Sequence, residues 1–416
     1  MRVVLTSHGS TGDIVPLVAL GQALNEAGHR CVFAASPLFK DLIEGAGVAF
    51  EPVPPEWSRA DASEAMRMLA RASTPLKQLK DIYAFGLPYL DEYIERIAEL
   101  TQGADLLVGS YLYPFLEAVA ERAGAKFAVA TYAHNAVPTK DNAPLPGLEL
   151  PWLPTTLGEA WRKGWWKLAD FAVARTLNQV IGQKLKAHGI PPVKSFFRRP
   201  APLALVTVSE KLFAPPTTRI DPRFHFTGYW RYQTAPNEAT ERELDDFCQG
   251  EEVPVLNFGS VSFDDAESLF SRFLANWPEG KKLIVQSGWV GFSQLEGAER
   301  EEIKIIGHAN HDRLFARASV VIHHGGAGTT ASALHSGRPQ IIIPHIADQH
   351  FWAAEVKRLG VALIGKRASW PDDLPRLVDG VESHAPLRSR AEEVAATLHS
   401  EHGPRRAVAL LEDLCR

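Results

Sequence analysis

The sequence predicts an α/β protein with two doubly wound parallel sheets, one in each half of the chain. Three observations predict this fold class. Short apolar strands alternate with helix-like segments in both halves, each half contains a strand that runs through a glycine turn into a helix, and a proline-rich stretch separates the halves. Open parallel sheets bind ligands at the carboxyl edge of their strands. We therefore expect two Rossmann-like domains that face each other across a ligand cleft.

The first half opens with a strand, a glycine turn and a helix start in residues 2–16. Pro16 suits the first turn of that helix, and Gly28 ends it. Apolar residues at helical spacing mark the helix between these points, namely Leu17, Leu20 and Leu24. The alternation continues with a strand, a helix and a strand in residues 30–36, 39–44 and 48–50. A strand of residues 203–208 is expected to be the last of this domain.

Proline and glycine punctuation predicts how the chain is divided. Pro215, Pro216 and Pro222, followed by residues 228–230, indicate a stiff linker. We expect a first domain of residues 1–214, a linker of residues 215–235, a second domain of residues 236–387 and a helical tail of residues 388–416. The tail has Ala, Leu and Val at helical spacing, with a break at Gly403.

The second half contains the most informative motif, an apolar strand, a glycine-rich turn and a helix start in residues 320–330. Glycines let the backbone approach an anion closely, and the first amides of a helix point toward it. The residues expected to contact the anion are His324, Gly325, Gly326, Gly328 and Thr329. No Gly-Lys-Ser/Thr follows, and the glycines do not fit Gly-x-Gly-x-x-Gly. The motif therefore predicts a diphosphate held without a Walker lysine.

The residues after this motif sharpen the prediction. Residues 331–336 continue the helix, Gly337 ends it, and residues 340–344 form a short apolar strand. Asp348 and Gln349 follow in a loop at the same edge of the predicted sheet. A carboxylate and a carboxamide offer acceptors and donors that suit sugar hydroxyls. A diphosphate site with such a pair further along the chain indicates a nucleotide sugar.

Residues 307–365 resemble the donor-binding half of the UDP-glycosyltransferase-like family, whose members have the GT-B fold. The run His-His-Gly-Gly-Ala-Gly-Thr-Thr, followed by Pro-x-x-x-Asp-Gln, is most similar to the bacterial antibiotic branch, beside the sterol and rhamnolipid glycosyltransferases. The resemblance implies a C-terminal helix that returns to the first domain. It also implies an inverting, metal-independent transfer of a hexose from a UDP- or dTDP-sugar. The acceptor would be a hydroxyl group of a lipophilic natural product, sterol or lipid.

The resemblance assigns the catalytic base to Asp13, in the Gly-Asp-x-x-Pro loop that begins at Gly12. The base takes the proton of the acceptor hydroxyl while that oxygen attacks the anomeric carbon opposite the leaving diphosphate. Plant members use a histidine that is oriented by an aspartate, but the matching strand of this chain ends in Ser110. We therefore expect Asp13 to act directly, with Ser110 or His8 nearby. The alternative is that Asp13 only caps the helix, a position where aspartate is favoured.

Three further segments resemble the family's nucleotide-binding turns. The residues implied are Gly259 and Ser260, then Ser287 and Trp289, then His308 and Ala309. His308 stands where the family has a tryptophan that stacks on the nucleobase, and its smaller ring stacks more weakly. The nucleoside of the donor can therefore be either uridine or thymidine. The alternative for all three segments is that they are ordinary strand ends.

The acceptor is expected to bind in the irregular, aromatic-rich region of residues 54–200, because a lipophilic ligand needs apolar walls with a few polar groups. The candidate acceptor-binding residues are His8, Tyr83, Ser110, Tyr113, Tyr132 and His134. The alternative is that most of these aromatic side chains belong to the core. Residues 161–167 interleave tryptophan with basic residues, so weak peripheral membrane contact for a lipid acceptor is a further hypothesis.

Composition sets the outer limits of function. The chain has 416 residues, of which 45% are hydrophobic, which is enough for two cores. A net charge of −5 gives no case for nucleic-acid binding. The 3 cysteines are widely spaced, so neither a Cys-x-x-Cys zinc site nor a disulfide framework is indicated, and a cytoplasmic location is expected. We find no signal-peptide pattern and no apolar segment long enough to span a bilayer.

Other functions share parts of this pattern. A nucleotide-sugar binding protein without transferase activity would have the same phosphate site, although Asp13 argues against it. A GT-B epimerase would release an altered sugar without an acceptor. A nicotinamide oxidoreductase is disfavoured because neither glycine turn has its fingerprint. No Asp-x-Asp triplet stands in a suitable loop, so we expect no metal and no cofactor besides the nucleotide-sugar co-substrate. The sugar, the acceptor and the oligomeric state stay open.

Overall fold

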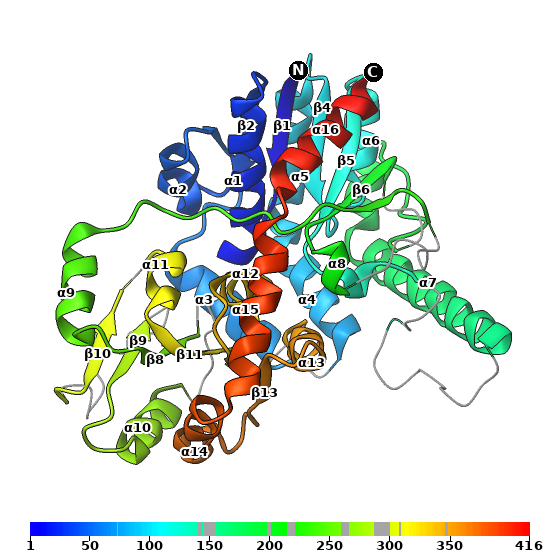
Figure 1. The fold of residues 1–416 in the computed structure, drawn as a ribbon. Helices are drawn as coiled ribbons and strands as arrows, with labels where there is room; N and C mark the ends of the chain where they lie inside the picture. Colours follow the sequence, from blue (N-terminus) through cyan, green and yellow to red (C-terminus); the bar gives the residue numbers. More distant parts are fainter. Residues whose placement is uncertain are drawn as a thin grey trace. The chain divides into compact units, whose positions relative to one another are not determined.

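The computed structural model describes residues 1–72, 74–139, 144, 155–197, 201–213, 221–258, 266–286, 300–307, 309–345 and 348–416. The chain divides into two compact units (Figure 1). The first comprises Met1–Ser58, Ala72–Trp230 and His402–Arg416, and the second comprises Arg59–Arg71 and Arg231–Glu401. Each unit contains one parallel sheet covered by helices, which confirms the predicted fold class.

The first unit is built on a seven-stranded parallel sheet in the order β3-β2-β1-β4-β5-β6-β7. Its strands are β1 (Arg2–Thr6), β2 (Arg30–Ala35), β3 (Ala49–Pro52), β4 (Leu106–Ser110), β5 (Lys126–Thr131), β6 (Leu203–Val206) and β7 (Phe224–Phe226). The central strands are continuous buried runs, as expected of a parallel sheet covered on both faces. The strand order reverses between β1 and β4, where Val3 pairs with Leu106. Ligands of doubly wound sheets bind at such a reversal, on the carboxyl side of the strands.

Helices surround this sheet. They are α1 (Thr11–Glu26), η1 (Pro37–Phe39), α2 (Lys40–Gly45), α4 (Pro75–Gly86), η2 (Leu87–Tyr89), α5 (Leu90–Thr101), α6 (Leu116–Arg122), η3 (His134–Ala136), α7 (Thr155–Ala187), α8 (Glu210–Phe213) and α16 (Gly403–Cys415). The prediction for the start of the first helix was wrong. Helix α1 begins at Thr11, so Pro16 lies in its second turn. The reason is that Ser10 and Asp13 cap the helix upstream of the proline.

The second unit contains a six-stranded parallel sheet in the order β10-β9-β8-β11-β12-β13. Its strands are β8 (Val253–Asn257), β9 (Leu283–Gln286), β10 (Ile303–Ile306), β11 (Ala318–His323), β12 (Gln340–Ile342) and β13 (Ala362–Ile364). Its helices are α3 (Arg59–Ala70), α9 (Glu238–Cys248), α10 (Ala266–Asn276), α11 (His311–Ala316), α12 (Ala327–Ser336), α13 (Gln349–Arg358), α14 (Trp370–Glu382) and α15 (Ala385–His399). The strand order reverses between β8 and β11.

Two apolar clusters cover the two faces of this second sheet. One gathers around Phe273 and Trp370, and the other around Leu314 and Phe315. Neighbouring residues of a strand contribute to opposite clusters, since successive side chains of a strand point to opposite faces. This double coverage leaves the ends of the strands as the accessible part of the sheet.

The C-terminal segment divides between the units. Helix α15 packs against α12 within the second unit. Helix α16 belongs to the first unit, where it packs along α1 and its Glu412 accepts a 2.9 Å contact from His29. Gly403 begins α16 against the carbonyl groups of Gly228 and Tyr229, where a side chain has no room. The segment that belongs with the first sheet is therefore shorter than the predicted tail of residues 388–416.

Among the described residues, no helix is both long enough and apolar enough to cross a membrane. The longest of them, α7, has 33 residues but carries charges along its length.

Candidate active site

The predicted phosphate-binding motif lies at the reversal point of the second sheet. We call residues 323–330 the second corner. Strand β11 ends at His323, Gly325 adopts a positive φ of 89°, and Gly326 is the N-cap of α12. Because its N-cap residue has no side chain, α12 has no side-chain cap. The amide groups of its first turn therefore lack intrahelical and capping partners, and they carry the positive end of the helix dipole.

His323 fixes the shape of this corner. Its Nδ1 accepts a 3.1 Å hydrogen bond from the amide of Gly325, so its Nε2 carries the proton and donates to Oε1 of Gln340 at 2.8 Å. Burial lowers the pKa of His323 to about 4, which keeps the ring neutral. His323 therefore holds the glycine turn against β12.

His324 lies over the glycine turn. A Cβ atom at position 326 would lie 2.3 Å from Nε2 of His324, so a side chain there would displace the ring. Burial and the neighbouring His323 and His345 lower the pKa of His324 to about 3. Nδ1 of His324 and Oγ1 of Thr330 are buried without a hydrogen-bond partner among the described residues. Buried polar atoms without partners are rare.

The predicted sugar-binding pair lies beside this corner, but its two members differ. Gln349 is buried, and its Oε1 accepts a 2.8 Å hydrogen bond from the amide of His345. Its carbonyl oxygen lies 3.1 Å from the position that a Cβ of Gly325 would take. Gln349 therefore supports the loop between β12 and α13. Asp348 is the N-cap residue of α13, and burial raises its pKa to about 6.

A buried polar cluster that the sequence analysis missed lies on the other side of the reversal point. Asn257 ends β8, and its Nδ2 donates to Oε1 of Gln286 at 2.7 Å and to Nε2 of His311 at 2.9 Å. Ala309, a predicted donor-binding residue, is buried just before α11. The amide side chain at the end of a buried strand was the available signal for this cluster, since such strands are otherwise apolar.

Five predicted donor-binding residues lie outside the described residues. They are Gly259, Ser260, Ser287, Trp289 and His308.

The first sheet has a matching corner at its own reversal point, residues 7–13, which we call the first corner. Ser10 is the N-cap of α1 and accepts a hydrogen bond from the amide of Gly12 at 3.2 Å. Oδ2 of Asp13 accepts from the amide of Ser10 at 2.8 Å and from its hydroxyl at 3.1 Å. This is a capping box with Asp13 at the third helical position. The carboxylate therefore has the capping geometry that we named as the alternative, while the side chain stays half-buried rather than directed into the core.

Tyrosine side chains surround Asp13. The hydroxyl of Tyr132 donates to the carbonyl oxygen of Asp13 at 3.0 Å. Burial raises the pKa of both Tyr113 and Tyr132, and the charge of Asp13 raises each of them further. Ser110 is fully buried at the end of β4 beside Tyr132, and its Oγ accepts a 3.4 Å hydrogen bond from the amide of Leu112. The structure thus brings Asp13, Ser110 and Tyr132 together at the first corner.

A second group of rings stands next to this one. The ring of His8 packs on Tyr93 at 4.4 Å and on Tyr113 at 5.7 Å between centroids, and burial lowers its pKa to about 4. Tyr83 packs on Tyr113 at 6.3 Å, and its hydroxyl donates to the carbonyl of Leu112. Tyr93 of α5 lies among the predicted acceptor-binding residues but was not itself predicted. Its spacing in the helix marks it only as a core residue. His134 lies apart from this group, against Phe213 at 5.1 Å.

Two family models match the chain. Residues 3–95 match the glycosyltransferase family 28 N-terminal domain, and residues 298–414 match the C-terminal domain of erythromycin biosynthesis protein CIII-like proteins. The glycosyltransferase GtfE of Amycolatopsis orientalis is 30% identical over 411 residues, which cover 96% of this chain and 94% of that relative. The chain belongs to the UDP-glycosyltransferase-like family of GT-B glycosyltransferases. The identity predicted from the two glycine corners is thereby confirmed, and the protein is a glycosyltransferase.

Similarity extends to other branches of the GT-B glycosyltransferases. A sterol 3-beta-glucosyltransferase of Neurospora crassa is 27% identical over the whole of this chain, which spans 27% of that relative's own length. The crystal structure of the glycosyltransferase VinC in complex with dTDP superposes with a TM-score of 0.69 at 18% identity, covering 100% of this chain and 99% of VinC. The last comparison shows that the two chains share the GT-B fold.

Proposed function

We propose that this glycosyltransferase moves a hexose from a UDP- or dTDP-sugar to a hydroxyl group of a lipophilic small molecule, with inversion and without a metal ion. The observation that carries the proposal is the uncapped N-terminus of α12 at the reversal point of the second sheet. Helix N-termini of this kind bind phosphate groups through backbone amides and the helix dipole. The glycine at the N-cap supports a diphosphate as the ligand, because it leaves the backbone open to a close approach of an anion.

In the proposed reaction, Asp13 is the general base. The acceptor oxygen attacks the anomeric carbon, the bond from that carbon to the diphosphate oxygen breaks, and the electron pair leaves with the diphosphate. Asp13 takes the proton of the acceptor hydroxyl as the new bond forms. The amides of the first turn of α12 and His324 stabilise the charge that develops on the leaving diphosphate, the role that a divalent ion has in other folds.

The sugar is proposed to contact Asp348. The carboxylate of this residue makes no capping hydrogen bond at the start of α13. Gln349 is proposed to act mainly through the loop that it holds, because its Oε1 is used by His345. For the acceptor, the rings around His8 and Tyr113 supply an apolar wall with a few polar atoms. The name of one relative, a sterol 3-beta-glucosyltransferase, supports a lipophilic acceptor.

The cytoplasm is the proposed location of the enzyme. The support is that Cys31, Cys248 and Cys415 are all free thiols, as is usual in a reducing compartment.

The proposal is tested by incubating the purified protein with mixed UDP- and dTDP-hexoses and a panel of lipophilic hydroxyl compounds, and by mass spectrometry of the products. We expect one hexose to be added to an acceptor, with inversion at the anomeric carbon by NMR and with no loss of rate in a chelator. Activity that a chelator removes and magnesium or manganese restores would contradict metal independence. An altered sugar released without any acceptor would point to an epimerase instead.

A further inference from the structure

Helix α7 presents an exposed apolar stripe that the reaction does not use. Leu157, Trp161, Leu168 and Phe171 are 58%, 41%, 53% and 64% exposed, and they are four of the six large hydrophobic side chains that are exposed among the described residues. They follow each other at intervals of four, seven and three positions, so they lie on one face of the helix. At 1.5 Å per residue the stripe is about 21 Å long.

The opposite face of α7 anchors the helix to the first unit. Trp166, Leu177 and Ile181 are buried on that face, and α7 packs against α4. Asp170 also points inward, where it accepts hydrogen bonds from the amides of Phe196 and Phe197 at 2.6 Å and 2.7 Å. The exposed stripe is therefore not the core-facing side of α7, because the opposite face of the helix already packs against the first unit.

This packing corrects the expectation for residues 161–167. Trp166 is 1% exposed and packs on Phe197 at 5.4 Å, so it belongs to the core. Trp165 is half-buried and supports Trp161 in an edge-to-face contact at 5.7 Å. Of the three tryptophans, only Trp161 belongs to the exposed stripe. Leu157 and Leu168, which the sequence analysis did not single out, complete it.

Basic residues border the stripe. Helix α7 carries six basic and two acidic residues, whereas the whole chain has a net charge of −5. Lys163, Lys167 and Arg175 are exposed, and none of the three has an ion-pair or hydrogen-bond partner among the described residues. Long basic side chains of this kind reach past an apolar surface to bring their charge to phosphate groups. Other basic residues, such as Arg317 and Arg388, are instead held by carboxylates.

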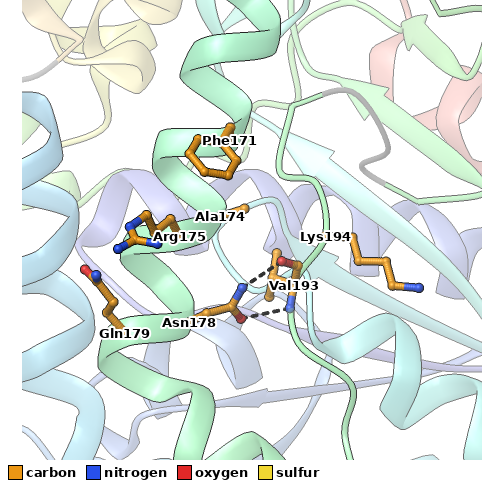
Figure 2. A pocket seen from close by; sticks show the side chains of 7 residues that line it. All are labelled: Phe171, Ala174, Arg175, Asn178, Gln179, Val193 and Lys194. Carbon is orange, nitrogen blue, oxygen red and sulfur yellow. Dashed lines mark hydrogen bonds between the residues drawn. The ribbon is translucent and has the colours of Figure 1, made fainter.

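A surface hollow of about 430 Å³ extends the stripe toward the C-terminal end of α7 (Figure 2). Phe171 stands at one side, Ala174 and Val193 line it, and Arg175 and Lys194 border it. Asn178 fixes this wall, because its side chain exchanges hydrogen bonds of 2.8 Å and 2.9 Å with the backbone of Val193 (Figure 2). The hollow thus combines an apolar lining with two exposed cations.

We propose that the stripe of α7 with its basic border is a peripheral membrane-binding surface for anionic phospholipid. A helix that lies in a bilayer interface needs an apolar face with large side chains, flanked by lysine and arginine. Both features are present on α7, and the excess of unpaired cations selects an anionic surface. A second copy of the chain is the weaker candidate, because two copies packed through this stripe would bring their cationic borders together.

The test is flotation of the full chain with phosphatidylcholine vesicles, with and without phosphatidylglycerol. We expect retention on the vesicles that contain phosphatidylglycerol, little retention on pure phosphatidylcholine, and release at high salt because screening weakens the attraction. Absence of retention on both kinds of vesicle overturns the proposal.

Variants locate the binding surface. We expect the double variant L168E/F171E to lower vesicle partitioning roughly a hundredfold. The control L76E/Y89E alters exposed hydrophobic side chains outside α7 and is expected to bind like the parent protein. We expect K163Q/K167Q to lower binding roughly tenfold. Its charge-matched control, K40Q/K126Q, should have no effect. Circular dichroism checks that every variant is folded.

Two outcomes would overturn the assignment to α7. One is that a variant of α7 and its control outside α7 lose vesicle binding equally. The other is a concentration-dependent dimer, seen by sedimentation, that L168E/F171E abolishes while vesicles are not bound. Because no step of the test measures glycosyl transfer, its failure is distinct from failure of the proposed function.

Discussion

The two glycine corners of this glycosyltransferase have the same design and opposite chemistry. In both, a buried parallel strand runs through a glycine with positive φ into a helix at the point where the strand order reverses. The corners match position by position: Ser10, Gly12 and Asp13 occupy the N-cap, second and third helical positions of α1, and Gly326, Gly328 and Thr329 occupy those of α12.

The difference lies in what caps each helix. The first corner supplies its own anion, since Asp13 accepts hydrogen bonds from Ser10 and offsets the positive end of the dipole of α1. The second corner has no capping side chain, and the ring above it, His324, is neutral. A helix N-terminus without its own anion attracts one from solution. One corner is therefore suited to hold a base and the other to hold a diphosphate.

The largest expected effect follows from removing the anion of the first corner. Asp13→Asn keeps the size of the side chain but removes the proposed base, so we expect kcat to fall by about 10²–10⁴. The rate is measured with saturating donor and acceptor. Asp41→Asn, which changes a carboxylate in the first turn of α2, is the matched control and should retain activity. If Asp13 were only a capping residue, Asp13→Asn would lower stability by about 0.3–1 kcal/mol, because Asn still accepts from Ser10 and only the charge near the helix dipole is lost. Full activity with a lower melting temperature would therefore assign it to capping alone.

The next effect comes from giving the second corner the anion of the first. Thr329→Asp places a carboxylate at the third position of α12. There it would repel a bound diphosphate and offset the positive end of the helix dipole. We expect the Kd of the nucleotide diphosphate to rise about tenfold to a hundredfold by calorimetry. Thr329→Asn, which has the same shape without the charge, should bind nearly as the parent protein does. Equal affinity of the Asp and Asn variants for the nucleotide diphosphate would show that the diphosphate does not bind at this helix.

A smaller effect is expected at His324. His324→Ala removes one proposed donor to the diphosphate, which corresponds to about a tenfold loss of affinity. The loss should appear for the nucleoside diphosphate and be absent for the nucleoside without phosphates. His335→Ala, in the last turn of the same helix, is the control. An equal loss of affinity for the nucleoside would show that His324 acts on the fold of the corner and not on the phosphates.

The smallest effect is the pH dependence of sugar recognition. Burial raises the pKa of Asp348 to about 6, so its carboxylate is ionised above that pH and becomes protonated below it. We expect the affinity advantage of the parent protein over Asp348→Asn for a nucleotide sugar to shrink about two- to fivefold as the pH falls through 6. Burial holds His323 and His324 neutral over the same range, so they should add no pH dependence. A constant advantage would exclude Asp348 as the titrating contact.

Local patterns in the sequence were sufficient to predict both corners. Glycine, a preceding apolar strand and a following helix are all local, so the positions of Asp13 and His324 could be read directly. Contacts that depend on neighbouring strands could not. His323 finds Gln340 only because β11 and β12 are adjacent in the sheet. The capping box of Ser10 and Asp13 starts α1 at Thr11, whereas Pro16 had suggested a later start.

Helix faces were predicted less well than strand ends. Tyr93 reaches the ring cluster from α5, and Trp166 turns inward on α7, because the packing partner of each helix decides which face is buried. Spacing identifies residues that share a face but does not say which face is exposed. For that reason the basic stripe of α7 became visible only when the buried side of the helix was known.

The most direct test of the contrast between the corners is a crystal structure with bound UDP or dTDP. We predict that the diphosphate accepts hydrogen bonds from the amides of Gly328 and Thr329 and from His324, with Asp13 making no contact to phosphate. A diphosphate bound elsewhere, or at the first corner beside Ser10, would contradict the account.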